Sequence, residues 1–279
     1  MRNIFCVDLE DWFHQSLVPQ ANINFKPTVE RNTDRLLEIF SDYNTKATFF
    51  TLGDIAENHS ALIKKIAAQG HEIACHSYSH RLIYDMSPEQ FREDTRKSKE
   101  ILEEISDTKI YGYRAPSWSV NKSTLWALDI LQELGFTYDS SIFPVHNFLY
   151  GIPGADRFPH EMLVNGKPFL ELPPSTFTFA GKNMGFSGGF YMRMLPGFII
   201  KHFTKMTNNE GHPVLFYLHP HEIDTKTPKF KVNMRDDIIS NWGKRHCEKK
   251  LIGILKDYSC TTIIDYIKEE IDYGNHKKA

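Results

Sequence analysis

Short apolar runs alternate along this chain with longer segments of helical periodicity. Seven runs rich in β-branched or aromatic residues are typical of strands. They cover residues 4–7, 47–52, 72–75, 110–113, 136–138, 169–172 and 214–218. Strands that alternate with helices in this way indicate an α/β fold with a parallel sheet.

Capping residues and glycines mark the helix ends. Pro27 and Thr28 open one helix, and residues 87–90 (Ser-Pro-Glu-Gln) form a capping box with proline at the first helical position. Gly70 and Gly135 stand where helices should end. The segment 143–168 is long and rich in Pro and Gly. It is interpreted either as a substrate-covering loop or as an irregular surface excursion.

Polar residues follow five of the predicted strands directly. They are Asp8, His76, Arg114, Asp139 and His219. In a parallel barrel the carboxyl ends of all strands meet at one rim, which is where barrel enzymes place their chemistry. We therefore expect these five side chains to gather at one site.

The segment His76-Ser77-Tyr78-Ser79-His80 carries two imidazoles four positions apart. If the segment forms a helical turn, both rings can bind one metal ion. A third ligand is available from the acidic cluster in Val7-Asp8-Leu9-Glu10-Asp11-Trp12. Two histidines and one carboxylate leave positions open for water and substrate, which indicates a catalytic metal site rather than a structural one.

Length and charge favour one catalytic domain that covers residues 1–279, with no linker or repeat. The formal net charge of −2 gives no indication of a nucleic-acid surface and suits a neutral or weakly charged substrate. No segment approaches the ~20 apolar residues of a membrane span.

The cysteines are scattered and form no C-x-x-C pair, so we expect buried free thiols and a reducing compartment. They are Cys6, Cys75, Cys247 and Cys260. The first apolar run, residues 4–7, ends at Asp8 and is too short for the apolar core of a signal peptide. The expected location is cytoplasmic.

The polar segments also resemble the motifs of a known family. They are Val7-Asp8-Leu9-Glu10-Asp11, His76-Ser77-Tyr78-Ser79-His80, Arg114-Ala115-Pro116-Ser117, Asp139-Ser140-Ser141 and Leu218-His219-Pro220-His221. In this order, over nearly the whole chain, they resemble the polysaccharide deacetylases of the NodB-homology type, which are carbohydrate esterases. The resemblance implies a distorted (β/α) barrel with about seven strands. It also implies a hydrolase that removes the acetyl group from an N-acetylated amino sugar or saccharide and releases acetate. Residues 112–117, 171–175 and 219–224 are most similar to deacetylases of exopolysaccharide gene clusters.

The resemblance also suggests residue roles. His76 and His80 would bind a divalent metal, most simply one Zn²⁺ per chain, although such ligands also accept iron, cobalt or nickel. The family's usual pair of adjacent aspartates is replaced by Asp8-Leu9-Glu10-Asp11. In an extended backbone Asp8 and Glu10 project to the same side, so we expect Asp8 to be the general base and Glu10 the third ligand. Asp11 as ligand, or Asp8 as ligand with another base, remains open.

The other motif residues have roles that complete hydrolysis. Arg114 resembles the family arginine that pairs with the base carboxylate, and His219 is expected to protonate the departing amine. Asp139 is expected to orient the catalytic histidine or to line the groove, and His221 to support the site from outside. Trp12 and Trp118 are interpreted as sugar-stacking or as packing residues.

Three other functions are consistent with parts of this pattern. The same fold and metal could hydrolyse a non-sugar amide, such as a cyclic amide. Two histidines and a carboxylate also suit a non-haem iron oxygenase, although Arg114 and His219 would have no role there. A metal-free glycan-binding module would need neither a base nor an acid. The sequence carries no signal for the identity of the sugar or for the oligomeric state.

Overall fold

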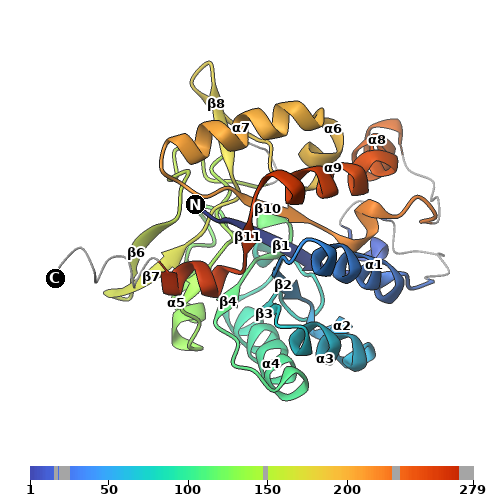
Figure 1. Ribbon diagram of the computed structural model, residues 1–279. Helices are drawn as coiled ribbons and strands as arrows, with labels where there is room; N and C mark the ends of the chain where they lie inside the picture. The colour runs from blue at the N-terminus through green and yellow to red at the C-terminus, as the bar shows by residue number, and fades with distance from the viewer. Residues whose placement is uncertain (16–17, 19–25, 147–149, 228–232, 270–279) are drawn as a thin grey trace.

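A curled sheet of mostly parallel strands forms the centre of the computed structural model (Figure 1), which describes residues 1–15, 18, 26–146, 150–227 and 233–269. The strand order is β10-β1-β2-β3-β4-β5-β7-β6, and β11 pairs with β1. The strands of this sheet are β1 (Asn3–Leu9), β2 (Thr48–Thr51), β3 (Glu72–Cys75), β4 (Gly112–Tyr113), β5 (Tyr138–Asp139), β6 (His160–Val164), β7 (Lys167–Glu171), β10 (Leu215–Leu218) and β11 (Cys260–Thr261). Among the described strand pairs of this sheet, only the β6–β7 pair is antiparallel. The fold is a half-barrel of the α/β class, as predicted.

Each of the seven predicted runs overlaps one of the parallel strands. The strands that were not predicted are β6, β11 and the separate hairpin of β8 (Thr176–Phe179) and β9 (Lys182–Gly185). The edge strand β6 is half exposed and carries few of the apolar residues that mark a buried strand. It lies in the segment 143–168, which is therefore not irregular throughout.

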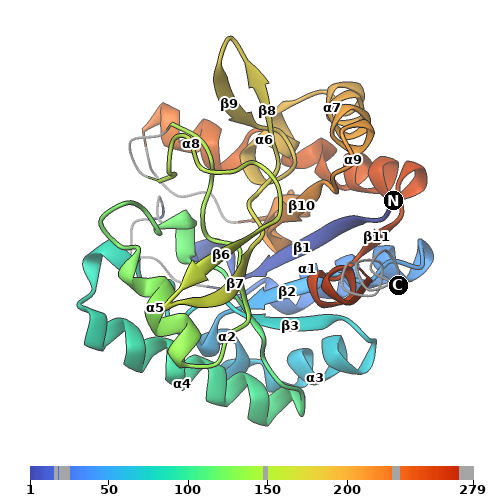
Figure 2. The same cartoon turned by 90° about the vertical axis from the view of Figure 1, so that its left-hand side faces the viewer.

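Helices cover the outer side of the sheet (Figures 1 and 2). They are α1 (Val29–Asp42), α2 (Gly53–Asn58), α3 (Ser60–Ala68), α4 (Pro88–Ser106), α5 (Trp126–Glu133), α6 (Gly189–Met194), α7 (Gly197–Asn209), α8 (Met234–Asn241) and α9 (Lys244–Asp257). The predicted capping box is confirmed, because Ser87 and Gln90 each accept the backbone N–H of the other. Gly70 and Gly135 adopt positive φ angles of 77° and 81° just after α3 and α5, as expected for helix ends.

Alternation along β1 separates two apolar clusters. Phe5, Val7 and Leu9 pack outward in the larger cluster, with the helices. Ile4 and Cys6 face the concave side, where Phe50, Tyr138 and Tyr217 complete a second cluster. Because side chains alternate with a period of two, Asp8 shares the concave face with Ile4 and Cys6. The strand therefore places a carboxylate inside the half-barrel.

The four cysteines are buried free thiols, as predicted. No helix among the described residues is long and apolar enough to cross a membrane.

Candidate active site

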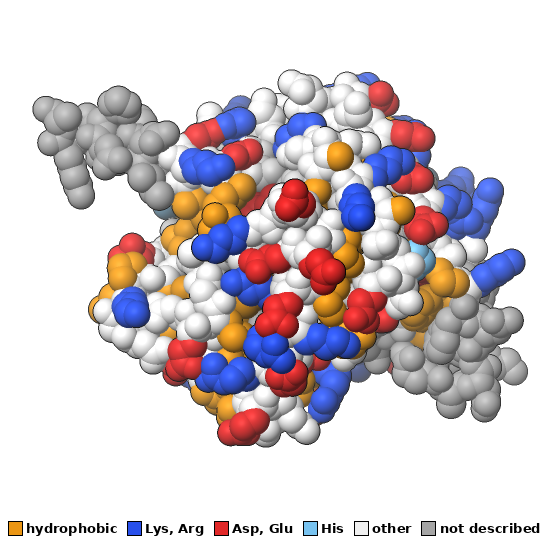
Figure 3. All heavy atoms as spheres, turned by 90° about the horizontal axis from the view of Figure 1, so that it is seen from below, with side chains coloured by type: hydrophobic (Ala, Val, Ile, Leu, Met, Phe, Trp, Pro, Cys, Tyr) orange, Lys and Arg blue, Asp and Glu red, His pale blue; other side chains and the backbone are white. Residues whose placement is uncertain are grey.

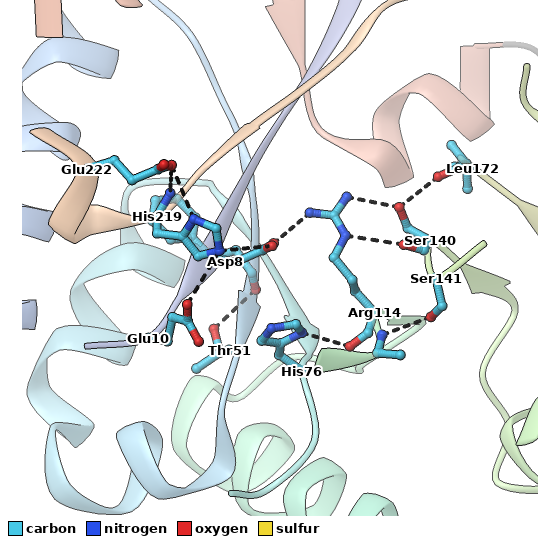
Figure 4. A network of polar contacts seen from close by, with 12 residues as sticks. Asp8, Glu10, Thr51, His76, Arg114, Ser140, Ser141, Leu172, His219 and Glu222 are labelled. Atoms are coloured by element: carbon cyan, nitrogen blue, oxygen red, sulfur yellow. Dashed lines mark hydrogen bonds and ion pairs between the residues drawn. The ribbon is translucent and has the colours of Figure 1, made fainter. Parts of the chain in front are cut away.

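Asp8 and Arg114 form a buried ion pair at the carboxyl ends of β1 and β4. Arg114 Nη1 donates to Asp8 Oδ1 over 2.6 Å. The rest of the guanidinium is also held: Nη2 donates to Ser140 Oγ over 2.9 Å, and the group lies 4.0 Å from the centroid of the Phe50 ring (Figure 4). Burial alone would lower the pKa of Arg114, but the adjacent Asp8 carboxylate raises it. Arg114 thus orients the Asp8 carboxylate, and the carboxylate keeps Arg114 charged.

His76, His80 and Glu10 lie together beside this pair. One ligand atom of each lies within 4.8 Å of the others. His76 Nδ1 lies 2.7 Å from the carbonyl oxygen of Arg114, so Nδ1 carries the proton and Nε2 presents its lone pair to the cluster. Burial lowers the pKa of His76 to about 4, which keeps the ring neutral. Neutral imidazole is the form that binds metals.

Glu10 supplies the carboxylate of this cluster. Burial alone would raise the pKa of Glu10, but the imidazoles of His80 and His219 hold it well below its usual range. Glu10 Oε2 lies 3.0 Å from His80 Nε2, yet it has no hydrogen-bond partner among the described residues although it is buried. A buried carboxylate oxygen without a donor, facing two imidazoles, fits a cation.

Asp11 is engaged elsewhere. Its Oδ1 accepts the N–H of Trp12 and the hydroxyl of Thr28, and its Oδ2 accepts the N–H groups of Thr28 and Val29 at 2.7 and 2.9 Å. These bonds join the end of β1 to the start of α1. Among the alternatives left by the sequence, the geometry favours Glu10 over Asp11 as the carboxylate ligand.

The expected helical turn at residues 76–80 is wrong. Ser77 and His80 have φ angles of 68° and 60°, so the segment is an irregular loop. Neighbouring elements hold this loop: the carbonyl oxygen of Ser77 accepts the N–H of Gly53, and Asp94 Oδ2 accepts the N–H of Tyr78. Tertiary hydrogen bonds, rather than helical periodicity, bring the two imidazoles together.

His219 faces the pair and the cluster from the end of β10 (Figure 4). Its Nε2 lies 3.4 Å from Glu10 Oε1 and 3.7 Å from Asp8 Oδ2, and its Nδ1 lies 3.1 Å from Glu222 Oε2. Burial alone would lower the pKa of His219, but Glu10, Glu222 and Asp8 together raise it to about 9. His219 therefore holds a proton at neutral pH, as a general acid must.

Two residues behind His219 were missed from the sequence. Glu222 Oε2 accepts the backbone N–H of His219 and faces its ring, and Arg193 Nε donates to Glu222 Oε1 over 2.6 Å. Arg193 also donates to the carbonyl oxygens of Ile239 and Trp242, which ties α8 to the site. The sequence did carry a signal for Glu222. It stands three residues after His219, with Pro220 between them, and this spacing is typical of a capping box at the start of a helix.

Asp139 does not take the place expected for it beside the catalytic histidine, because Glu222 occupies that place. The Asp139 carboxylate accepts the hydroxyl and N–H of Ser141. Burial raises the pKa of Asp139 and, with Asp139 beside it, that of Glu171. Ser141 in turn accepts the N–H of Ala115, so Asp139 acts on the loop after Arg114 rather than on His219.

The remaining candidates differ in their exposure. His221 is buried, and its ring lies 5.1 Å from that of His219. Burial, and after it the positive charge of Lys244, hold the pKa of His221 well below the usual range. Trp12 is fully buried and donates to the carbonyl oxygen of Lys26, so it packs and cannot stack on a sugar. Trp118 is half-buried against Tyr217, whose ring lies 6.3 Å from that of His219.

Two family models together cover most of the chain. The model for polysaccharide deacetylases matches residues 19–138, and the model of a domain of unknown function (DUF3473) matches residues 140–268. A peptidoglycan deacetylase from Helicobacter pylori is 34% identical over 113 residues, which are 40% of this chain and 37% of that protein. The chain thus matches little more than a third of this relative's length.

Solved structures share the fold. The structure described as a polysaccharide deacetylase from Mycobacterium smegmatis has a TM-score of 0.58 and 24% identity, covering 88% of this chain and 78% of that one. A probable polysaccharide deacetylase from Pseudomonas aeruginosa PAO1 has a TM-score of 0.60 and 16% identity, covering 93% and 86%. The chain therefore contains a domain of the polysaccharide deacetylase family, and the solved structures show that most of the chain shares this fold.

Proposed function

We propose that this protein is a metal-dependent deacetylase that removes the acetyl group from an N-acetylated amino sugar and releases acetate. The observation that carries the proposal is the arrangement of three groups around one point. Three metal-ligand candidates (Glu10, His76, His80) have ligand atoms within 4.8 Å of one another. The imidazole of His219, the proposed acid, lies 3.4 Å from Glu10 and 3.7 Å from the Asp8 carboxylate, which is the base in this proposal. Amide hydrolysis needs all three functions.

The residues fit a divalent cation. Glu10 Oε2 is buried and has no hydrogen-bond donor in the part of the chain that the structure describes, and the hydrogen bond from His76 Nδ1 to the Arg114 carbonyl leaves the lone pair of His76 Nε2 for a ligand. A bound divalent cation would lower the pKa of its water to about 7 and polarise the acetyl carbonyl. Zinc is our first choice, and iron, cobalt and nickel suit the same donors.

The chain's own groups handle the protons. Asp8, held in place by Arg114, takes a proton from the attacking water as the water oxygen bonds to the acetyl carbon. The carbon–nitrogen bond then breaks, His219 Nε2 gives its proton to the departing nitrogen, and acetate and a free amine leave. Glu222 on Nδ1 holds the His219 ring so that Nε2 faces the site.

We further propose that residues 1–279 form one catalytic domain, although two family models divide them. Strand β10, which lies in the second family match, pairs with β1. His219 also lies in the second match, and it reaches Asp8 and Glu10, which stand before the first residue of the first match. The proposed base, Asp8, and the proposed acid, His219, thus come from segments far apart in the sequence.

The substrate remains a proposal at the level of an N-acetylated saccharide. The half-buried Trp118, near Tyr217 and His219, gives the site an aromatic edge suited to a sugar ring. An exopolysaccharide substrate and a cytoplasmic location stay predictions from the sequence.

Metal content and acetate release together test the proposal. Elemental analysis of untagged protein should give about one metal ion per chain in the wild type and none in His80→Ala. Asp8→Asn should keep the metal and lose acetate release from N-acetylated sugars. The exposed His246→Ala is the matched control and should change neither. If the wild-type protein stayed metal-free after incubation with zinc, the assignment of a metal site would be refuted. Hydrolysis of a cyclic amide, with no acetate released from N-acetylated sugars, would show that the substrate is a non-sugar amide.

A further inference from the structure

Residues 172–209 contain no Asp or Glu, although the chain has 35 acidic residues among 279. The same stretch contains four cationic residues, Lys182, Arg193, Lys201 and Lys205. Arg193 is buried on Glu222, and Lys201 pairs with Asp257, whereas Lys182 and Lys205 are exposed. The segment builds the β8–β9 hairpin, α6 and α7. It therefore contributes a positive surface to an otherwise nearly neutral chain.

Large apolar side chains are exposed on the same segment. Phe179, next to the turn of the hairpin, is 68% exposed, and Phe198, at the start of α7, is 72% exposed. Met184 on β9 and Met206 on α7 are each 45% exposed. Exposed phenylalanines and methionines gathered on neighbouring elements mark an interaction surface, whereas scattered ones do not.

The hairpin and α7 are packed together. The Phe177 ring stacks on the Phe203 ring at a centroid distance of 3.9 Å, which fixes β8 on α7. Phe203 lies toward the hairpin, while Phe198, His202, Lys205 and Met206 follow one another on the exposed side of α7 at helical spacing. In Figures 1 and 2 the hairpin projects beyond α7 at one end of the molecule. We call Phe179, Lys182, Met184, Phe198, Lys205 and Met206 the hairpin–α7 surface.

The opposite end has a different character. Seen from below, the molecule shows acidic and basic side chains interspersed (Figure 3). On α4, for example, Arg96 pairs with Glu93 and Glu100. Such a face is typical of a surface that stays in water.

We propose that the hairpin–α7 surface docks on a membrane that contains anionic lipids. A protruding hairpin with a phenylalanine near its turn can enter the interface between headgroups and acyl chains, where apolar side chains leave water. Lys182 and Lys205 flank the apolar side chains and match the negative charge of lipid phosphates. Residues 172–209 add no acidic side chain that would oppose them, and the exposed Glu210 follows at the end of α7. A polysaccharide partner fits less well, because phenylalanine and methionine offer no hydrogen bonds to hydroxyl groups. The proposal is independent of the deacetylase activity.

Vesicle co-sedimentation of the full chain tests this docking. We expect the wild type to pellet with vesicles of phosphatidylcholine and phosphatidylglycerol, more weakly with phosphatidylcholine alone, and less at high salt. Phe179→Ser with Phe198→Ser should lower the vesicle affinity by about tenfold or more. Lys182→Gln with Lys205→Gln should abolish the preference for anionic vesicles.

Leu163→Ser is the matched control, because Leu163 is 74% exposed on β6, outside this surface. It should leave vesicle binding unchanged, and circular dichroism should show all variants folded. Wild-type protein that does not pellet, or equal losses in the Leu163 and Phe179/Phe198 variants, would overturn the proposal. Concentration-dependent dimers that the Phe179/Phe198 variant abolishes, without vesicle binding, would assign the surface to a second copy of the chain instead.

Discussion

Arg114 Nη1 donates to Asp8 Oδ1 over 2.6 Å, and both side chains are almost completely buried. Removing one partner of such a pair leaves the other as an uncompensated buried charge. We therefore expect a larger energetic consequence than for the exposed ion pairs of the described residues.

Arg114→Met should lower the free energy of unfolding by about 3–5 kcal/mol. Adding Asp8→Asn should recover part of that loss, because the uncompensated carboxylate is then gone. Urea unfolding of the two single variants and the double variant measures the coupling. The control is Arg92→Met, whose exposed pair with Glu133 should contribute only about 0–1 kcal/mol. Strict additivity of the Arg114 and Asp8 effects would contradict the pairing.

Glu222→Gln should lower kcat by about 100-fold or more and leave KM nearly unchanged. The carboxylate holds the tautomer and orientation of His219, and both of its oxygens are engaged, Oε1 by Arg193 and Oε2 by His219. Steady-state acetate release over a range of substrate concentrations separates kcat from KM. Arg193→Met should repeat the effect in weaker form, whereas the exposed Glu161→Gln should have none. A raised KM with unchanged kcat would mean that Glu222 does not act through His219.

Lys244→Met should stabilise the protein at neutral pH. Burial lowers the pKa of Lys244 to about 8 from 10.5, and Nζ has no hydrogen-bond partner among the described residues. Between pH 8 and 10.5 Lys244 binds more protons in the unfolded chain than in the folded protein. The free energy of unfolding of the wild type should therefore increase with rising pH in this range. Below pH 8 the full cost of charging the buried amine is present.

The variant should therefore be more stable than the wild type by about 2 kcal/mol at pH 7. This advantage should shrink as the pH rises to 10. Urea unfolding at several pH values measures the difference, and the exposed Lys249→Met is the control. A difference that does not change between pH 7 and 10 would show that Lys244 does not titrate as described.

The sequence by itself determined the strands and the rim. Apolar runs long enough to be buried predicted the seven parallel strands, and the polar residues that directly follow five of these runs predicted which side chains would meet. This works because the carboxyl ends of parallel strands share one edge of a sheet, so position along the chain translates directly into position in space. Asp8, Arg114 and His219 are the clearest cases.

Only the tertiary structure decided how the site is held. The loop of residues 76–80 takes its shape from backbone bonds to α2 and to Asp94, and not from its own periodicity. Asp11 lies apart from the Glu10–His76–His80 cluster because Thr28 and Val29 supply donors for it. Arg193 reaches Glu222 from a different helix. These choices depend on which donors and acceptors from distant segments arrive within about 3 Å, and no local pattern encodes that distance.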